Sequence, residues 1–277
     1  MKFFSGVRLL ISALILAGLG FGLQGCGGGG GGTSNPADAN PTGYYDITGT
    51  VNIDDDGAGG GSTAITDLEG MINGTRFMMI SDVHGLMYDG TITSISANDF
   101  AANVSIFKHG QPIANPSASI SGTITEKSKV EGTITGTGAG NSSGMFTLQY
   151  ATNNNKAANV SRIERTGGNV WGSKLSTGSS YSDFNIDSAG NLVSSGGTAS
   201  NGFFVGCDLG NGSFTPITGT SLYNVTMNVT GCTDTTIHLT YVGLAASLDR
   251  FGVDGALVIG VTDSKKTYSI NGDFILQ

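Results

Sequence analysis

The sequence has few of the residues on which enzymes and helical proteins depend. Its 277 residues include 13 Lys and Arg, 21 Asp and Glu, three His and five Pro. So few titratable side chains provide few candidate general acids and bases, and we expect no enzymatic activity. The scarcity of proline and the lack of a three-residue glycine period exclude a collagen-like fold. No segment beyond residue 26 has a helical period of ten or more residues, which argues against a helical bundle.

Glycine, in contrast, is abundant, with 46 residues, and its share is more than twice the usual value of about 7%. From Tyr44 onward, apolar and polar residues alternate between clusters of Gly, Asn, Asp and Ser. In the stretch 221–230, for example, Tyr223, Val225 and Met227 share one face. Alternation interrupted every 8 to 12 residues is typical of antiparallel sandwiches and barrels.

A short motif recurs in the first half, at Asp89–Thr93, Ser121–Thr125 and Glu131–Thr135. Each copy has a Gly followed by alternating Thr and Ile. This pattern suits a strand that bends tightly and then packs one apolar side chain. The repeats therefore indicate a meander of similar hairpins.

We predict an all-β fold with two small antiparallel meander β-barrels, because closure removes exposed sheet edges; two β-sandwiches are the alternative. The first barrel is expected over residues 43–164 and the second over 168–277. The expected strands lie near 44–53, 75–81, 86–95, 99–108, 117–126, 129–136, 143–150 and 158–164, and then near 170–175, 181–187, 190–195, 202–207, 212–217, 222–230, 235–244, 255–262 and 266–276.

The first 26 residues have the features of a targeting segment. Lys2 and Arg8 precede an uncharged apolar run, and Leu23-Gln24-Gly25-Cys26 follows. This tetrapeptide resembles the lipobox of bacterial lipoproteins. The resemblance implies that residues 1–25 are a signal peptide, that the Cys26 thiol carries diacylglycerol, and that the new amino terminus carries a fatty acid such as palmitate. The alternatives are a secretory signal or an uncleaved anchor, but about 15 apolar residues are short for a span of about 20.

Residues 26–42 are expected to be a lipidated cysteine followed by a flexible Gly-rich linker that spans roughly 22 Å. Cleavage would leave 11 basic and 21 acidic residues, a net charge of −10. An acidic body makes nucleic acid an improbable partner, so we expect the membrane to be reached through the lipid alone. Gly27, rather than Asp, follows Cys26, which resembles the sorting pattern for the outer membrane.

The chain as a whole resembles a broad group of Gly-rich bacterial envelope lipoproteins that carry small soluble β-barrels. In the second half, the resemblance rests on Asn201–Cys207, Leu222–Val225 and Tyr241–Leu244. It implies a lipid-anchored binding or structural module with an unidentified protein or small-molecule partner, but no reaction. A membrane-spanning barrel is a further alternative, although polar strand faces rich in Asn and Thr would be costly against lipid.

A second alternative is a lipocalin-like carrier of a small apolar ligand, since an eight-stranded barrel can hold one such ligand. The analogy is loose, because Gly168 and Trp171 are one residue too far apart for a lipocalin G-x-W motif. Inward-facing residues would close the lumen, and the candidates are Met78, Ile80, Met227, Tyr241 and Phe274.

Few residues are candidates for chemistry. Cys207 and Cys232 remain after Cys26 is lipidated, and an even pair in an exported chain predicts a disulfide. Asp54 and Asp56, within an acidic Gly-rich loop, are the candidate ligands for calcium, which would suit a calcium-stabilised adhesin-type domain; otherwise we expect no cofactor. His238 alternates onto a polar face, so a zinc site with Cys232 is not expected. The G-x-S-x-G match at 140–144 lies between predicted strands, which favours a turn over a hydrolase elbow.

Overall fold

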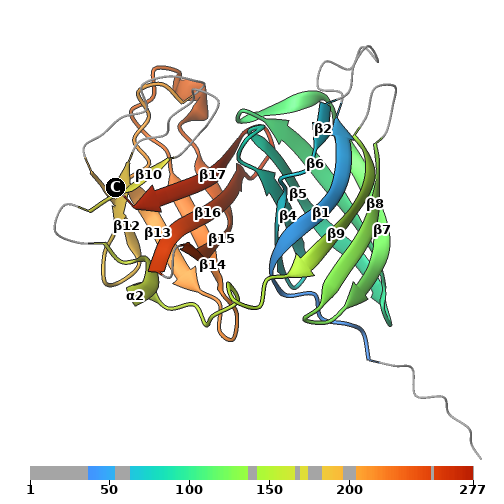
Figure 1. Cartoon of the computed structure of the whole chain (residues 1–277). Coiled ribbons are helices and arrows are strands. Elements are labelled where there is room, and N and C mark those ends of the chain that lie inside the picture. Colours follow the sequence, from blue (N-terminus) through green and yellow to red (C-terminus); the bar gives the residue numbers. More distant parts are fainter. Residues whose placement is uncertain are drawn as a thin grey trace, which may run out of the picture. The chain divides into compact units, whose positions relative to one another are not determined.

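The computed structural model describes residues 37–53, 63–136, 142–165, 169–173, 183–195, 204–250 and 253–276. Residues Ala37–Gln277 belong to one compact unit, which contains two closed antiparallel barrels (Figure 1). The prediction of an all-β fold with two meander barrels is therefore confirmed, and the sandwich alternative is wrong. In the described part of the chain, no helix has the length and apolar character needed to cross a membrane.

The first barrel is a meander that closes on its own first strand. The barrel is closed because β1 pairs with β9 along Tyr45–Asn52. β2 and β3 both pair with the other edge of β1, so together they take one strand position. The strands are β1 (Gly43–Ile53), β2 (Thr63–Ile65), β3 (Glu69–Asn73), β4 (Arg76–Ser81), β5 (Leu86–Ser96), β6 (Asp99–Lys108), β7 (Gln111–Thr125), β8 (Lys129–Gly136) and β9 (Ser143–Tyr150).

The second barrel is closed by pairing of its first and last strands, where Trp171 lies opposite Leu276. Its first three strands are short and its last four are long. The strands are β10 (Trp171–Ser173), β11 (Phe184–Ile186), β12 (Asn191–Ser194), β13 (Asn211–Pro216), β14 (Leu222–Asn228), β15 (Thr240–Arg250), β16 (Val253–Asp263) and β17 (Ser269–Leu276).

Three predicted strands are wrong in whole or in part. Residues near 158–164 contain the short helix α2 (Val160–Ile163), because the Asn159 side chain accepts a hydrogen bond from the Arg162 amide and caps it. Phe204–Gly206 form a turn where a strand was expected near 202–207. The segment 235–244 begins with the 3₁₀ helix η1 (Thr235–Ile237), and β15 starts only at Thr240.

The glycines of the repeated motif make room for aromatic rings inside the first barrel. Gly90 pairs with Phe77 and Gly122 pairs with Phe100. Gly132 and Gly49 both pair with Phe146. A Cβ on Gly132 would lie 2.6 Å from the Phe146 ring, so a larger residue there would displace the ring. The isoleucines of the motif, Ile92, Ile124 and Ile134, are buried in the same core as the motif predicts.

A third apolar cluster lies between the barrels, and we call it the seam cluster. Met71, Met78, Ile80 and Met87 contribute to it from β3–β5, while β14–β16 contribute Leu222, Leu244, Ala246, Leu248, Ala256 and Val258. Gly260 of β16 lies directly against this surface, since a Cβ there would be within 3.2 Å of the Met78, Ile80 and Met87 side chains.

The seam cluster corrects one detail of the sequence analysis. Met78 and Ile80 were expected inside a barrel, but they face the seam, and Phe77 and Met79 take the interior positions. Met227, Tyr241 and Phe274 do lie in the core of the second barrel. Because both faces of β4 are buried, its apolar run has no alternation that could identify the inner face.

The segment between the barrels is held to both of them. The Asn155 Oδ1 accepts hydrogen bonds from the Tyr44 amide of β1 and from the Ser221 hydroxyl next to β14, both at 2.9 Å. Its Nδ2 donates to the Tyr44 carbonyl oxygen at 2.7 Å. Farther along, Lys156 and Arg162 form ion pairs with Asp249 of β15. The connecting segment therefore fixes the two barrels to each other as well as joining them.

Candidate functional site

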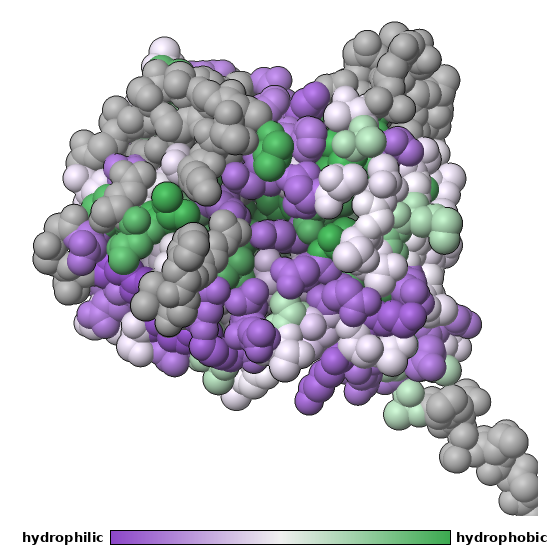
Figure 2. Space-filling model, viewed as in Figure 1, coloured by the Kyte–Doolittle hydropathy of each residue, from purple (hydrophilic) through white to green (hydrophobic). Residues whose placement is uncertain are grey.

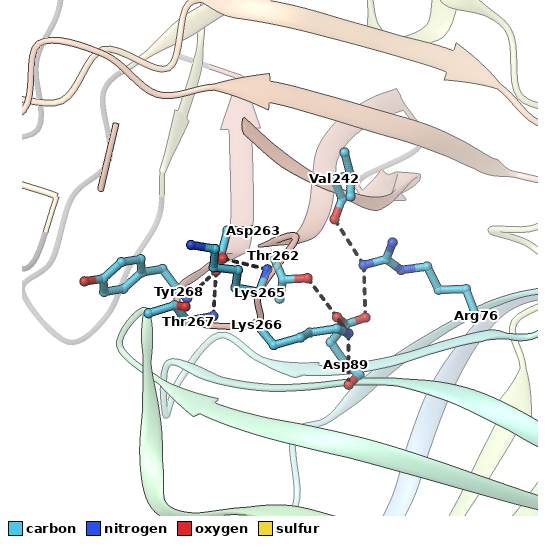
Figure 3. A network of polar contacts seen from close by, with 9 residues as sticks. All are labelled: Arg76, Asp89, Val242, Thr262, Asp263, Lys265, Lys266, Thr267 and Tyr268. Carbon is cyan, nitrogen blue, oxygen red and sulfur yellow. Dashed lines mark hydrogen bonds and ion pairs between the residues drawn. The ribbon is translucent and has the colours of Figure 1, made fainter. Parts of the chain in front are cut away.

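The seam contains one fully buried acidic side chain, Asp89 of β5. Its Oδ1 lies 3.0 Å from Nη2 of Arg76 in β4. Its Oδ2 accepts hydrogen bonds from the second barrel, from the Thr262 hydroxyl at 2.8 Å and from Lys266 Nζ. Figure 3 shows Arg76 and Lys266 reaching the carboxylate from opposite sides. A buried charge is tolerated only when it is paired and hydrogen-bonded. Here Arg76 of the first barrel binds one carboxylate oxygen, and Thr262 and Lys266 of the second barrel bind the other.

Lys266 is placed by a tight turn between β16 and β17. The Asp263 carboxylate accepts hydrogen bonds from the backbone amides of Lys265, Thr267 and Tyr268, at 2.6 to 2.9 Å. Within this clamp Lys266 has a φ of 57°, a left-handed conformation that is uncommon for a residue with a side chain. These hydrogen bonds therefore hold Lys266 in a strained backbone conformation that directs its ammonium group to Asp89.

A groove of about 520 Å³ runs over the outer face of β5, β6 and β7 and ends at this ion pair. We call it the seam groove. Most side chains that line it carry a hydroxyl or an amide. Its described lining consists of Asp89, Gly90, Thr91, Thr93, Asn103, Val104, Ser105, Ser117, Ala118, Ser119 and Lys266.

The hydroxyl and amide side chains of the seam groove form two rows across the strands. Thr91 pairs with Asn103, which pairs with Ser119. Asp89 pairs with Ser105, which pairs with Ser117. Neighbouring strands lie about 4.8 Å apart, so the rows form a regular polar surface with the Lys266 ammonium at one corner.

A second groove, of about 480 Å³, crosses the outer wall of the first barrel at β7, β8, β9 and β1. Met145 stands on this wall with 73% of its surface exposed. Polar side chains surround it, among them Thr48, Thr123, Glu131 and Thr147. On the face drawn in Figure 2, hydrophilic and neutral residues cover most of the described surface and apolar residues are scattered.

The interiors of both barrels are occupied by large side chains. Phe77 lies 6.4 Å from Phe100 and 6.3 Å from Phe146, measured between ring centroids. In the second barrel, Phe184 and Phe274 are 5.1 Å apart. Trp171 donates a hydrogen bond from Nε1 to the Ile163 carbonyl oxygen at 2.9 Å. A ligand inside either barrel would have to displace such buried side chains.

The G-x-S-x-G serine is part of this interior. Ser142 is buried, and its hydroxyl lies 2.9 Å from the Tyr88 hydroxyl. Strand β8 precedes the motif and strand β9 follows it, whereas a hydrolase elbow requires a helix after the serine. Burial raises the pKa of Tyr88 to about 12, although the hydrogen bond to Ser142 acts in the opposite direction. The serine is therefore a partner for a buried tyrosine.

The predicted site residues have different outcomes. Cys207 and Cys232 form a disulfide, as predicted. Cys26, Asp54 and Asp56 lie outside the described residues, so the lipid attachment and the calcium site stay predictions. The His238 Nε2 lies 3.3 Å from the Cys232 carbonyl oxygen. Within the described ranges, no group of three His, Cys, Asp or Glu residues could hold a metal ion.

Comparisons of the chain with protein-family models, with curated proteins and with solved structures found no match. The geometry and the sequence therefore carry the functional argument.

The sequence analysis did not identify Asp89, Lys266 or the seam groove. Asp89 belongs to the repeated motif, where it was read only as part of a strand. One signal was available, since the segments 77–80 and 256–261 are apolar without interruption except for Gly260. Continuous apolar runs are typical of strands that are covered on both faces. Asp89 lies opposite Met78 of the first run, on the neighbouring strand β5, and an acidic residue beside a strand covered on both faces needs an ion-pair partner.

Proposed function

We propose that this chain is a lipid-anchored bacterial envelope protein whose two-barrel body is a non-enzymatic binding module. The observation that carries the proposal is the filled interior of both barrels next to a polar groove on the outer face. Such an arrangement supports binding at the surface rather than transport within the lumen. The lipocalin-like carrier is for this reason the weaker alternative, because a ligand would have to displace Phe77, Phe100 or Phe146.

The chemistry of the seam groove favours binding over catalysis. Asp89 is the one acidic side chain in its described lining. Both oxygens of that carboxylate already accept hydrogen bonds from Arg76, Thr262 and Lys266. A general base needs an oxygen within hydrogen-bond reach of the substrate proton, and both oxygens of Asp89 are already engaged by protein donors.

The anchor is proposed from the sequence. Cys26 follows the apolar run in a lipobox-like tetrapeptide and lies 17 residues before the start of β1 at Gly43. Two or three acyl chains give stable attachment, which one chain does not. The Gly-rich tether would then hold the body clear of the lipid headgroups, and we expect the outer membrane as the destination.

Metabolic labelling with an alkyne analogue of palmitate in a bacterial host tests the anchor. We expect the wild-type protein to take up the label and to sediment with the outer membrane, and Cys26→Ala to lose both properties. A variant with Cys207→Ala and Cys232→Ala is the matched control, because it loses two cysteines but should keep the label. An unlabelled wild type, or a labelled Cys26→Ala variant, would contradict the proposal.

A further inference from the structure

The seam groove combines neutral polar side chains with one ammonium group. The described lining has six hydroxyl or amide side chains, namely Thr91, Thr93, Asn103, Ser105, Ser117 and Ser119. The Thr93 and Ser119 hydroxyls donate to the Ala101 and Thr135 carbonyl oxygens, so to a ligand these two offer acceptor lone pairs. The Asp89 carboxylate at the end of the groove is occupied by Arg76, Thr262 and Lys266. A ligand in this groove therefore meets hydroxyls along its length and a cation at its end.

Lys266 keeps a donor for a ligand. An ammonium group has three N–H donors, and the recorded acceptors of Lys266 Nζ are two oxygens of Asp89. The Lys266 side chain is 39% exposed, so its remaining donor is accessible to solvent. Because the turn clamped by Asp263 fixes the backbone, this donor has a defined position at the edge of the groove.

The charge around the groove differs from that of the whole chain. The chain has a formal net charge of −8. At the end of the groove, Arg76 and Lys266 both form ion pairs with Asp89, so this group has two positive charges and one negative charge, a net of +1. A local positive charge in an acidic protein favours an anionic group at this point.

The dimensions suit a small molecule. A volume of about 520 Å³ lies within the range of roughly 300–1,000 Å³ typical of ligand sites. The two rows of polar residues, Thr91–Asn103–Ser119 and Asp89–Ser105–Ser117, extend over three neighbouring strands. Such a surface offers hydrogen-bond partners to several hydroxyl groups of one ligand at the same time.

From these features we propose that the seam groove binds a hydroxylated anion, namely a sugar that carries one phosphate or carboxylate group. The anionic group contacts Lys266, and the sugar hydroxyls lie over the two polar rows. This inference rests on the proposed function as a binding module, but it does not depend on the lipid anchor.

Isothermal titration calorimetry on the full-length protein tests this proposal. The protein is kept in an uncharged polyoxyethylene detergent, because maltoside detergents would present sugars to the groove. The probes are glucose 6-phosphate, glucuronate, glucose and inorganic phosphate. We expect both anionic sugars to bind at least tenfold more tightly than glucose or phosphate alone.

One variant tests the cation and another tests the polar rows, and each has a matched control. Lys266→Gln should weaken glucose 6-phosphate binding at least tenfold, whereas Lys265→Gln, with the same charge change one residue away, should leave it unchanged. Since Lys266→Gln removes a partner of Asp89, its thermal midpoint is measured in parallel. Thr91→Val with Asn103→Leu changes only exposed side chains and should weaken both anionic sugars, while Thr50→Val should not.

Three results would overturn the proposal. The first is that neither anionic sugar binds at 10 mM or below, on the order of the weakest specific affinities. The second is that a folded Lys266→Gln variant binds as tightly as the wild type. The third is that inorganic phosphate binds as tightly as the sugar phosphate, which would remove the role of the hydroxyl rows. Palmitate labelling is independent of all three, so the anchor and the groove are tested separately.

Discussion

Both barrels are closed antiparallel meanders, but their walls are stabilised by different means. The first barrel has strands of up to 15 residues, and ladders of seven or more residue pairs join β5 to β6, β6 to β7, β7 to β8, β8 to β9 and β9 to β1. Within the described residues, the second barrel has three consecutive strands of three or four residues, and β10 and β11 share a single residue pair. Backbone hydrogen bonds therefore contribute less to the stability of the second barrel at β10–β12.

Other interactions are concentrated where the second barrel has short strands. The Cys207–Cys232 disulfide ties the segment between β12 and β13 to the segment after β14. Trp171 of β10 is buried and hydrogen-bonded to Ile163, and the Arg165 guanidinium lies 4.4 Å from its ring centroid. In the second barrel, a covalent bond and side-chain contacts therefore take the place of some ladder hydrogen bonds.

Removing the disulfide should have the largest effect and should act on the second barrel alone. Replacing Cys207 and Cys232 with alanine releases a loop of 25 residues, and we expect a loss of about 3 kcal/mol of unfolding free energy. Trp171 is the chain's single tryptophan, so its fluorescence in a urea titration reports the second barrel. Reductant should reproduce the effect in the wild type. An unchanged midpoint would mean that the short-strand wall does not need the bond.

An alkaline titration should affect the first barrel instead. Burial raises the pKa of Tyr88 from 10 to about 12, so the folded state holds this proton more tightly than the unfolded state. The stabilisation from Tyr88, about 2–3 kcal/mol, is fully present below pH 10 and is lost as the pH rises to 12. Burial also raises the pKa of Tyr45 in the same barrel, which adds to the loss. The free energy of unfolding, measured by circular dichroism at each pH, should fall over this pH range, and we call this fall the alkaline slope.

Two variants test whether Tyr88 is the source of the alkaline slope. Tyr88→Phe should reduce it, although the variant starts about 1 kcal/mol less stable because Ser142 loses its hydrogen-bond partner. Tyr268→Phe, in the second barrel, should keep the wild-type slope. Equal slopes in the two variants would assign the alkaline loss to other tyrosines.

A substitution at one motif glycine should have the smallest effect of the three. A Cβ on Gly122 would lie 1.9 Å from the Glu131 carbonyl oxygen and 2.8 Å from the Phe100 ring, so Gly122→Ala should cost about 1–3 kcal/mol. Gly74→Ala is the control, since nothing lies within 4 Å of its Cβ and only its φ of 56° is strained. Thermal denaturation should give the lower midpoint for Gly122→Ala. The reverse order would show that the Gly–Phe pairing does not limit the packing.

Most of the fold could be predicted because its information is local. Alternation and turn residues place β6, β8 and β9 with the bounds that the structure has. β2 and β3 were not predicted. β2, at Thr63–Ile65, is too short to show a period. Helix α2 was predicted as a strand, although Asn159 is a typical capping residue.

The candidate site was harder to predict because it depends on contacts between distant segments. Asp89 and Lys266 are 177 residues apart, and no periodicity relates them. The orientation of Met78 and Ile80 could not be assigned for the related reason that β4 is apolar on both faces. The disulfide was predictable, since only two cysteines remain after Cys26.

The seam cluster has a consequence for the order in which the protein is made. The first barrel is complete at Tyr150, the end of β9, whereas Thr240, the start of β15, is synthesised 90 residues later. A first barrel that folded during this interval would leave Met71, Met78 and Met87 as an uncovered apolar face, with Arg76 as the ion-pair partner of Asp89 from its own barrel. Such an intermediate would present a methionine-rich surface that is prone to aggregation. The second barrel covers this surface with residues of β14–β16 once these strands have folded.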